Sequence, residues 1–226
     1  MTGSLEQSSS GVMERLLDAT YTTVLNGFGV FKSAETLANE YLAQNAGDAQ
    51  RAAADLIAWQ TTKAAASGFV TNLGGIAALP VAIPANISSV LYLQLRMVAA
   101  IALMGGYDVR SDKVRTLVYV SLLGSAATDI LKKAGIKLGE RLTQAAIVRM
   151  TGYVARRMST SAAARLLARL GLSQAGKLSR LVPVAGGVIA GATDAAATKA
   201  IGTIAMQVFV PVTGETPPLV ALPTEL

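Results

Sequence analysis

Apolar residues recur along most of the chain at spacings of three and four, the pattern of helices with one buried face. No segment shows the sustained apolar–polar alternation of a half-buried strand. Gly, Pro and Asn-Gly positions divide the pattern, and Asp48 stands where a helix N-cap is expected. The predicted helices cover residues 12–25, 34–44, 49–73, 85–104, 113–133, 137–158, 161–170, 173–181 and 184–210. We therefore predict an all-α protein built as a single-domain helical bundle with Gly/Ala-rich apolar core helices.

The helical pattern is confined to one continuous region of the chain. Residues 1–11 are polar and are predicted to be a disordered tail, whereas residues 12–210 form the helical domain. Residues 211–226 are rich in Pro and are expected to be extended. The chain of 226 residues is long enough for one domain with a sizeable core.

One apolar stretch raises the question of a membrane span. Residues 64–95 carry no formal charge, and this stretch of 32 residues exceeds the roughly 20 that cross a bilayer as a helix. Paired glycines and two prolines divide it, however, and Arg96 follows directly. A charge at mid-bilayer costs about 2.5–3.5 kcal/mol on insertion scales, and Asp194 and Lys199 raise the same objection for the last helix. We expect buried helices of a globular domain, or a bent hairpin that enters one leaflet.

The amino-acid composition excludes several kinds of catalytic and metal-binding site. The chain contains no Cys and no His, so a disulfide, a zinc-thiolate site, a cysteine nucleophile and a Ser-His-Asp triad are excluded. We expect no enzyme activity, no metal and no cofactor, and a carboxylate-based hydrolase would need two carboxylates converging beside a polar cleft. The N-terminus lacks the basic and apolar regions of a signal peptide, which favours a cytoplasmic protein.

Positive charge is concentrated in one segment. The net charge is +6, but residues 132–180 contain eleven Lys or Arg and a single acid, Glu140, for a net +10. On a helical wheel of residues 137–158 the basic and apolar positions separate, with Thr143, Ile147, Met150 and Val154 opposite the cations. The predicted basic face consists of Lys137, Arg141, Arg149, Arg156 and Arg157.

Such a basic amphipathic helix suits anionic lipid headgroups, at about 1 kcal/mol per basic residue near the surface. An ordinary solvated face is the alternative interpretation. Nucleic acid is not expected as a partner, because aromatic interleaving is absent apart from Tyr153.

Two charges interrupt the most apolar helices. A buried charge is tolerated mainly when it is paired, so we predict that Arg96 and Asp194 meet, with Gln94 or Lys199 nearby. The alternative is that these four residues are polar anchors in a mostly apolar pocket for a lipid or small molecule.

Two further motifs have ordinary interpretations. The segment "GLSQAGK", residues 171–177, matches the phosphate-binding loop pattern, but Leu178 stands where Ser or Thr should bind magnesium, so we interpret it as a linker between helices. Gly187, Gly191 and Ala195 leave one side of the last helix nearly bare. Another helix can therefore approach closely, either within the protein or at a membrane.

Two segments each join glycines and prolines to an apolar helix. The first joins a Gly-rich bend and two prolines to an apolar helix with a Gln-x-Arg centre, Gln94 to Arg96, and a closing Gly-Tyr-Asp turn. The second, "LVPVAGGVIAGATDAAATKAIGTIAMQVF", joins Pro183 to a Gly-rich helix that carries Asp194. Together these two segments resemble the EcsC family of bacterial proteins, and the resemblance covers about residues 48–210.

The resemblance implies little biochemistry. The family takes its name from a gene beside an ABC transporter in some bacteria, and a similar helical domain attached to some bacterial GTPases is thought to face membranes. No catalytic residue follows from it. The predicted function is a non-enzymatic peripheral membrane or lipid-binding protein on the cytoplasmic face of the membrane. The alternative is a soluble accessory module that docks on a membrane transporter or another protein through an apolar groove.

Overall fold

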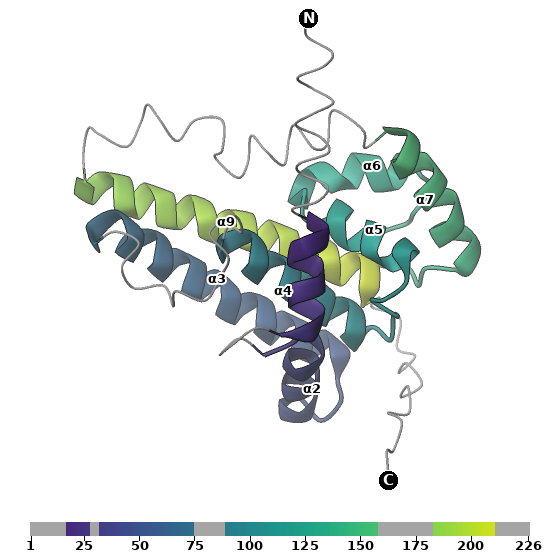
Figure 1. Cartoon of the computed structure of the whole chain (residues 1–226), viewed down its shortest axis with the longest axis horizontal. Coiled ribbons are helices and arrows are strands. Elements are labelled where there is room, and N and C mark those ends of the chain that lie inside the picture. Colours follow the sequence, from purple (N-terminus) through teal and green to yellow (C-terminus); the bar gives the residue numbers. More distant parts are fainter. Residues whose placement is uncertain (1–16, 28–31, 75–88, 158–182, 211–226) are drawn as a thin grey trace, which may run out of the picture.

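The computed structural model describes residues 17–27, 32–74, 89–157 and 183–210, and in these ranges the chain forms helices and turns without strands. A helix over residues 17–26 precedes the labelled elements of Figure 1. The labelled helices are α2 (Ala34–Gln44), α3 (Ala49–Gly74), α4 (Ser89–Met104), α5 (Asp112–Ser121), α6 (Ala127–Lys133), α7 (Gln144–Arg157) and α9 (Pro183–Phe209), and a 3₁₀ turn, η2 (Gly124–Ala126), lies between α5 and α6. The predicted all-α class is confirmed.

Local signals set the ends of the first helices where the sequence predicted them. The carboxylate of Asp48 accepts a hydrogen bond from the backbone N–H of Arg51 at 3.0 Å, which caps α3. Gly106 has a φ of +78° just after α4, a left-handed conformation that ends the helix. The bounds of α2 are those predicted, while the predicted beginning of α4 lies outside the described residues.

The single helix predicted over residues 113–133 is wrong. The structure divides it into α5 and a second piece over residues 124–133, and the two pieces meet at a bend of 119°. Gly124 is buried and has a φ of +55°, which no continuous α-helix allows. The sequence hid this break because Leu122 and Leu123 are both buried, so the apolar pattern continues through it.

α3 and α9 form a long antiparallel pair, side by side in Figure 1. The side-chain amide of Gln50, at the start of α3, donates to the carbonyl oxygen of Val210 at 2.8 Å. Seven residues along α3, Ile57 packs over Gly202 of α9. α9 has 27 residues, so it is about 40 Å long.

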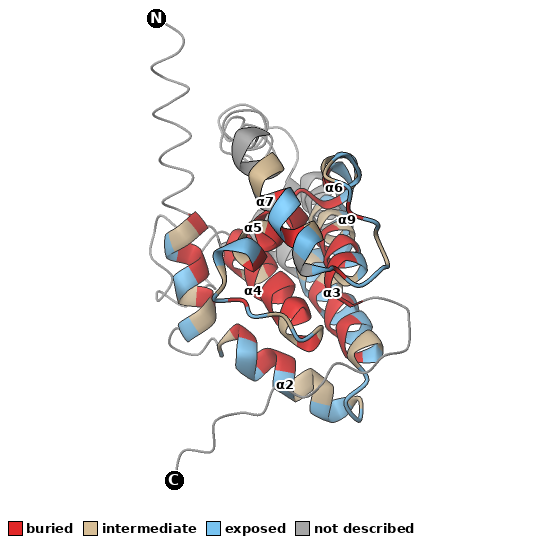
Figure 2. Cartoon of the chain, turned by 90° about the vertical axis from the view of Figure 1, so that its right-hand side faces the viewer, coloured by how far each residue is buried: buried red, intermediate tan, exposed pale blue. Residues whose placement is uncertain are grey.

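α4 runs parallel to α9 and forms the centre of the core. Gln94 contacts Thr198, and eleven residues further along both helices Gly105 lies against Phe209. Residues 91–102 of α4 are buried on every side except at Leu93, as the continuous red ribbon in Figure 2 shows. A helix that is buried on nearly every side is expected at the centre of a bundle, and here Gln94 and Arg96 are buried with its apolar residues.

Among the described residues, no single helix combines the length and apolar composition of a membrane span. α5 together with residues 124–133 meets those two criteria only as the bent pair described above. The predicted helices over 161–170 and 173–181, the phosphate-loop-like segment 171–177 and both predicted tails lie outside the described residues.

Candidate functional site

Two polar side chains meet where the two family-motif helices pack together. The amide of Gln94 in α4 contacts the hydroxyl of Thr198 in α9 at 3.5 Å, and both residues are buried. Gln94 therefore lies at the α4–α9 contact, where a polar contact within the core fixes the register of two otherwise apolar helices.

Arg96 points away from this contact. Two residues along an α-helix turn through about 200°, so a Gln94 that faces α9 directs Arg96 toward α2. Arg96 is only 8% exposed, and its guanidinium donates to the carbonyl oxygen of Lys32 at 3.3 Å. It also lies 5.8 Å from the ring centroid of Tyr92. Burial lowers the pKa of Arg96, and the nearby hydroxyl of Tyr92 opposes that effect.

Asp194 lies elsewhere, so the predicted pairing of Arg96 with Asp194 is wrong. In the parallel register of α4 and α9, Asp194 is level with position 90, about 9 Å along the axis from the level of Arg96. Asp194 is half-buried, and burial raises its pKa, whereas Lys199 is exposed. The assignment of Arg96, Gln94, Asp194 and Lys199 to a ligand pocket stays a prediction.

The second candidate site is an exposed cationic surface. We use the name basic surface for the exposed cations of the α6 end, the following connection and α7. They are Lys132, Lys133, Lys137, Arg141 and Arg149. Lys137 forms an ion pair with Glu140 at 3.4 Å, whereas Lys132, Lys133 and Arg149 belong to none of the ion pairs within the described residues. Arg156 and Arg157 lie in α7, but their side chains are outside the described part of the chain.

The predicted helical face is corrected in one respect, because Lys137 and Arg141 precede α7 instead of lying on it. Gly139 has a φ of +84°, which ends any helix there. Thr143, which was predicted on the apolar face, is the N-cap residue of α7, and its hydroxyl accepts from the N–H of Ala146 at 3.2 Å. The predicted burial of Ile147 and Met150 is confirmed.

Backbone contacts hold the connection before α7 against the core. The N–H of Gly139 donates to the carbonyl oxygen of Gln207 near the end of α9, at 2.8 Å. The N–H of Leu142 donates to the hydroxyl oxygen of Tyr107 at 3.3 Å. Burial raises the pKa of Tyr107, and the positive charge of Arg141 acts in the opposite direction. The basic surface is therefore attached to the ends of α4 and α9.

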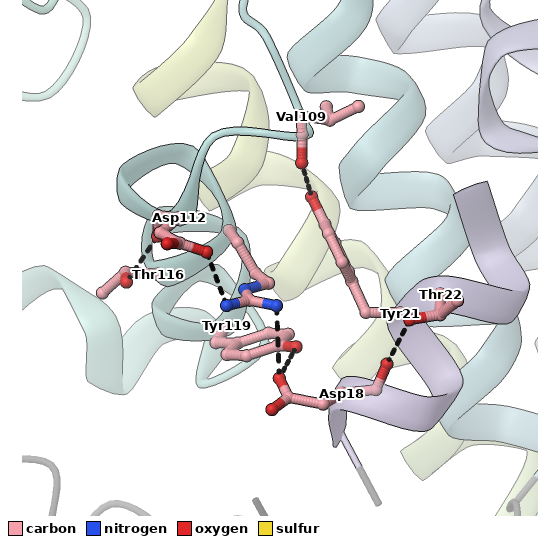
Figure 3. A network of polar contacts seen from close by, with 8 residues as sticks. Asp18, Tyr21, Thr22, Val109, Asp112, Thr116 and Tyr119 are labelled. Atoms are coloured by element: carbon pink, nitrogen blue, oxygen red, sulfur yellow. Dashed lines mark hydrogen bonds and ion pairs between the residues drawn. The ribbon is translucent and has the colours of Figure 1, made fainter. Parts of the chain in front are cut away.

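A polar network that sequence reasoning missed joins residues 17–26 to α5 (Figure 3). Tyr119 donates to the carboxylate of Asp18 at 2.8 Å, and Arg115 lies between Asp18 and Asp112, at 3.8 and 2.6 Å. The hydroxyl of Tyr21 donates to the carbonyl oxygen of Val109 at 2.8 Å. No local motif reveals contacts between residues about a hundred positions apart.

The chemistry of this network is structural. Burial raises the pKa of Tyr21 and of Tyr119 well above the ordinary range, so both hydroxyls stay protonated and act as hydrogen-bond donors. Their rings meet edge to face at 5.5 Å. Within the described residues, no three Asp or Glu side chains gather as a metal-binding group.

Two exposed apolar side chains were also missed. Trp59 of α3 is 51% exposed, and Val148 of α7 is 50% exposed. A sequence pattern assigns such residues to the core by default, because exposure depends on which neighbour covers each helical face.

The fold and these sites define an all-α helical protein with a centrally buried helix and an exposed cationic surface. The chain belongs to the EcsC protein family, whose model matches residues 7–210. The match begins earlier than the resemblance predicted at residue 48, so it includes the helix over residues 17–26 and α2. No curated protein and no solved structure shows significant similarity to the chain.

Proposed function

We propose that this EcsC family member is a non-enzymatic peripheral membrane protein that binds anionic lipid headgroups through the basic surface. The carrying observation is the group of exposed cations on the α6 end, its connection and α7, which includes three that make no ion pair within the described residues. Figures 1 and 2 both place α6 and α7 on the side of the molecule opposite α2. We expect a planar membrane to meet these cations from that side.

Val148 supports the proposal. Its side chain is half-exposed directly beside Arg149, on the solvent side of a helix whose other side is anchored by Met150. An apolar side chain among cations suits the headgroup region, where charge attracts the protein and apolar area is removed from water. The contribution of one valine is small, so the binding we propose is reversible and depends mainly on charge.

The cytoplasmic leaflet is the proposed location. Its anionic lipids produce a negative surface potential that attracts Lys and Arg at about 1 kcal/mol per residue. This attraction decays over about 8–10 Å at physiological ionic strength. The proposal therefore requires direct contact between the basic surface and the headgroups.

Co-sedimentation with vesicles tests the proposal. We expect binding to phosphatidylcholine vesicles that contain phosphatidylglycerol, weak binding to phosphatidylcholine alone, and loss of binding as salt is raised. Replacing Lys132, Lys133 and Arg149 with Gln should weaken binding on the order of 100-fold, since three contributions of about 1 kcal/mol each total about 3 kcal/mol. Circular dichroism should show an unchanged helical fold, because all three side chains are exposed.

A matched control removes the same charge elsewhere. Arg51, Arg110 and Lys199 are exposed cations outside the basic surface, and their replacement by Gln should change binding much less. Equal losses in the two triple variants would show that only net charge matters. Equal binding to neutral and anionic vesicles would contradict the proposal, and no binding to either would favour docking on a membrane transporter or another protein.

A further inference from the structure

One face of α3 carries an unusual exposed sequence of side chains. Asp55, Trp59 and Lys63 follow one another at intervals of four residues, so they lie on successive turns of the same face. All three are exposed, and Trp59 is the only tryptophan of the chain. The ammonium group of Lys63 lies 4.9 Å from the centroid of the Trp59 ring. This cation–π contact holds the ring against its own helix.

Within the described part of the chain, the two charges of this face have no oppositely charged partner. Neither Asp55 nor Lys63 belongs to an ion pair there, and the two are about 12 Å apart along the helix, too far to pair with each other. The opposite side of α3 is used by the fold, since Ala53 and Ile57 are buried. Partly exposed tryptophans of this kind are enriched in protein interfaces, where they contribute much of the binding energy.

Asp55 and Lys63 lie four residues before and four residues after Trp59, and they carry opposite charges. We propose that this face binds a second copy of the chain, with the two α3 helices antiparallel across a twofold axis at Trp59. That pairing places Asp55 of each copy opposite Lys63 of the other and brings the two indole rings together. Parallel pairing in register would instead oppose Asp55 to Asp55 and Lys63 to Lys63, which is unfavourable.

The neighbouring exposed residues on this face permit such an approach. Thr62 and Ala66 are small, and Arg51 is held in an ion pair with Asp48, so Trp59 and Lys63 are the large side chains that the second copy must accommodate. A contact between two helical faces buries less than the roughly 1,200 Å² of a stable interface. The dimer is therefore weak and forms at high local concentration. The face lies on α3, away from α6 and α7 in Figure 1, so the dimer leaves the basic surface accessible.

Sedimentation velocity over a range of protein concentrations, read together with Trp59 fluorescence, tests the dimer. We expect concentration-dependent dimerisation with a blue shift of the emission as the ring becomes buried. Asp55→Lys alone and Lys63→Asp alone should each weaken dimerisation about tenfold or more, because each creates like-charge contacts. The double variant with both changes exchanges the charges and should restore the dimer. A mixture of the two single variants should form mixed dimers.

Control variants test whether dimerisation depends on the Asp55–Lys63 contacts or on the net charge of the protein. Asp129→Lys and Lys113→Asp make the same charge changes at exposed positions outside the face and should leave dimerisation unchanged. Trp59→Ala should abolish the dimer while circular dichroism stays the same. The proposal is overturned by a monomer at every soluble concentration, or by a dimer that both single variants leave intact. It is also overturned if the emission shifts with vesicles but not with protein concentration, because Trp59 would then contact lipid.

Discussion

Arg96 shows how an apolar helix can bury a guanidinium. One guanidinium nitrogen donates to the carbonyl oxygen of Lys32, and the charge lies beside the Tyr92 ring, in a setting that includes no carboxylate from α9. Replacing Arg96 with Met removes a hydrogen bond to a charged group, which costs about 1.5–3 kcal/mol, although the smaller desolvation cost of Met offsets part of this loss.

A double-mutant cycle therefore has a definite expected result. Arg96→Met and Asp194→Leu should have additive effects on the free energy of unfolding, within about 0.5 kcal/mol, because the two side chains lie apart. Urea denaturation of the wild type, both single variants and the double variant measures the coupling. A coupling of 2 kcal/mol or more would show that the charges interact.

The half-buried carboxylate of Asp194 gives a prediction about pH. Burial raises its pKa above the usual 3.8, so the folded state holds the proton more tightly than the unfolded state. This carboxylate therefore favours folding below pH 3.8, and that contribution is lost as pH rises through the folded pKa. Asp194→Asn stays neutral and should have a higher Tm than the wild type at pH 7.

The comparison across pH isolates the carboxylate. The Tm advantage of Asp194→Asn should shrink as the buffer is taken from pH 7 to below pH 4, where Asp194 itself is protonated. Asn and Asp have similar helix propensities, so the backbone contributes little to the difference. A Tm difference that is constant over this range would mean that Asp194 titrates as it does in the unfolded chain.

At the scale of the elements, two glycines permit the closest helix contacts. A Cβ at Gly202 would lie 2.6 Å from the Ile57 side chain, and one at Gly105 would lie 2.0 Å from the backbone oxygen of Phe209. Gly202→Ala should therefore destabilise the fold by about 1–3 kcal/mol, partly offset by better helix propensity. Gly105→Ala should cost more, because a backbone oxygen cannot rotate away as a side chain can.

Chemical denaturation can also identify the cause. Combining Gly202→Ala with Ile57→Ala removes the atoms that clash, so the double variant should be less destabilised than the sum of the single variants. Simple additivity would indicate that α3 and α9 separate slightly instead of clashing at this contact.

These elements also show what the sequence can and cannot predict. The bounds of α2 and the capped start of α3 were predicted correctly, because capping and turn residues act over a few positions. The Gly124 bend was not predicted, since buried leucines continue the pattern across it. Periodicity also indicates which residues share a helical face but not which helix covers that face. The Arg96–Asp194 pairing failed for this reason, and the exposure of Trp59 was missed for the same reason.

At the scale of the whole molecule, charge is strongly segregated. Residues 132–180 carry a net charge of +10, whereas the whole chain carries only +6. The remainder of the chain therefore has a net negative charge. If the basic surface binds lipid locally, binding to anionic vesicles should persist near the sequence pI of about 9.7, where net charge vanishes but Arg stays charged. Co-sedimentation at this pH, with neutral vesicles as the control, makes the measurement. Binding that falls to the neutral-vesicle level would show that net charge governs it.

The parallel arrangement of α4 and α9 has a consequence for the basic surface. Both helices end on the same side, so the negative ends of two macrodipoles add there, next to the connection that carries Lys137 and Arg141. We therefore expect these two cations to offset helix dipoles as well as facing solvent, whereas Arg149 lies on a separate helix. Replacing Lys137 and Arg141 with Gln should lower stability at low ionic strength, an effect that salt removes. Arg149→Gln should leave stability unchanged, so thermal denaturation at two salt concentrations distinguishes cations that support the fold from cations that serve only at its surface.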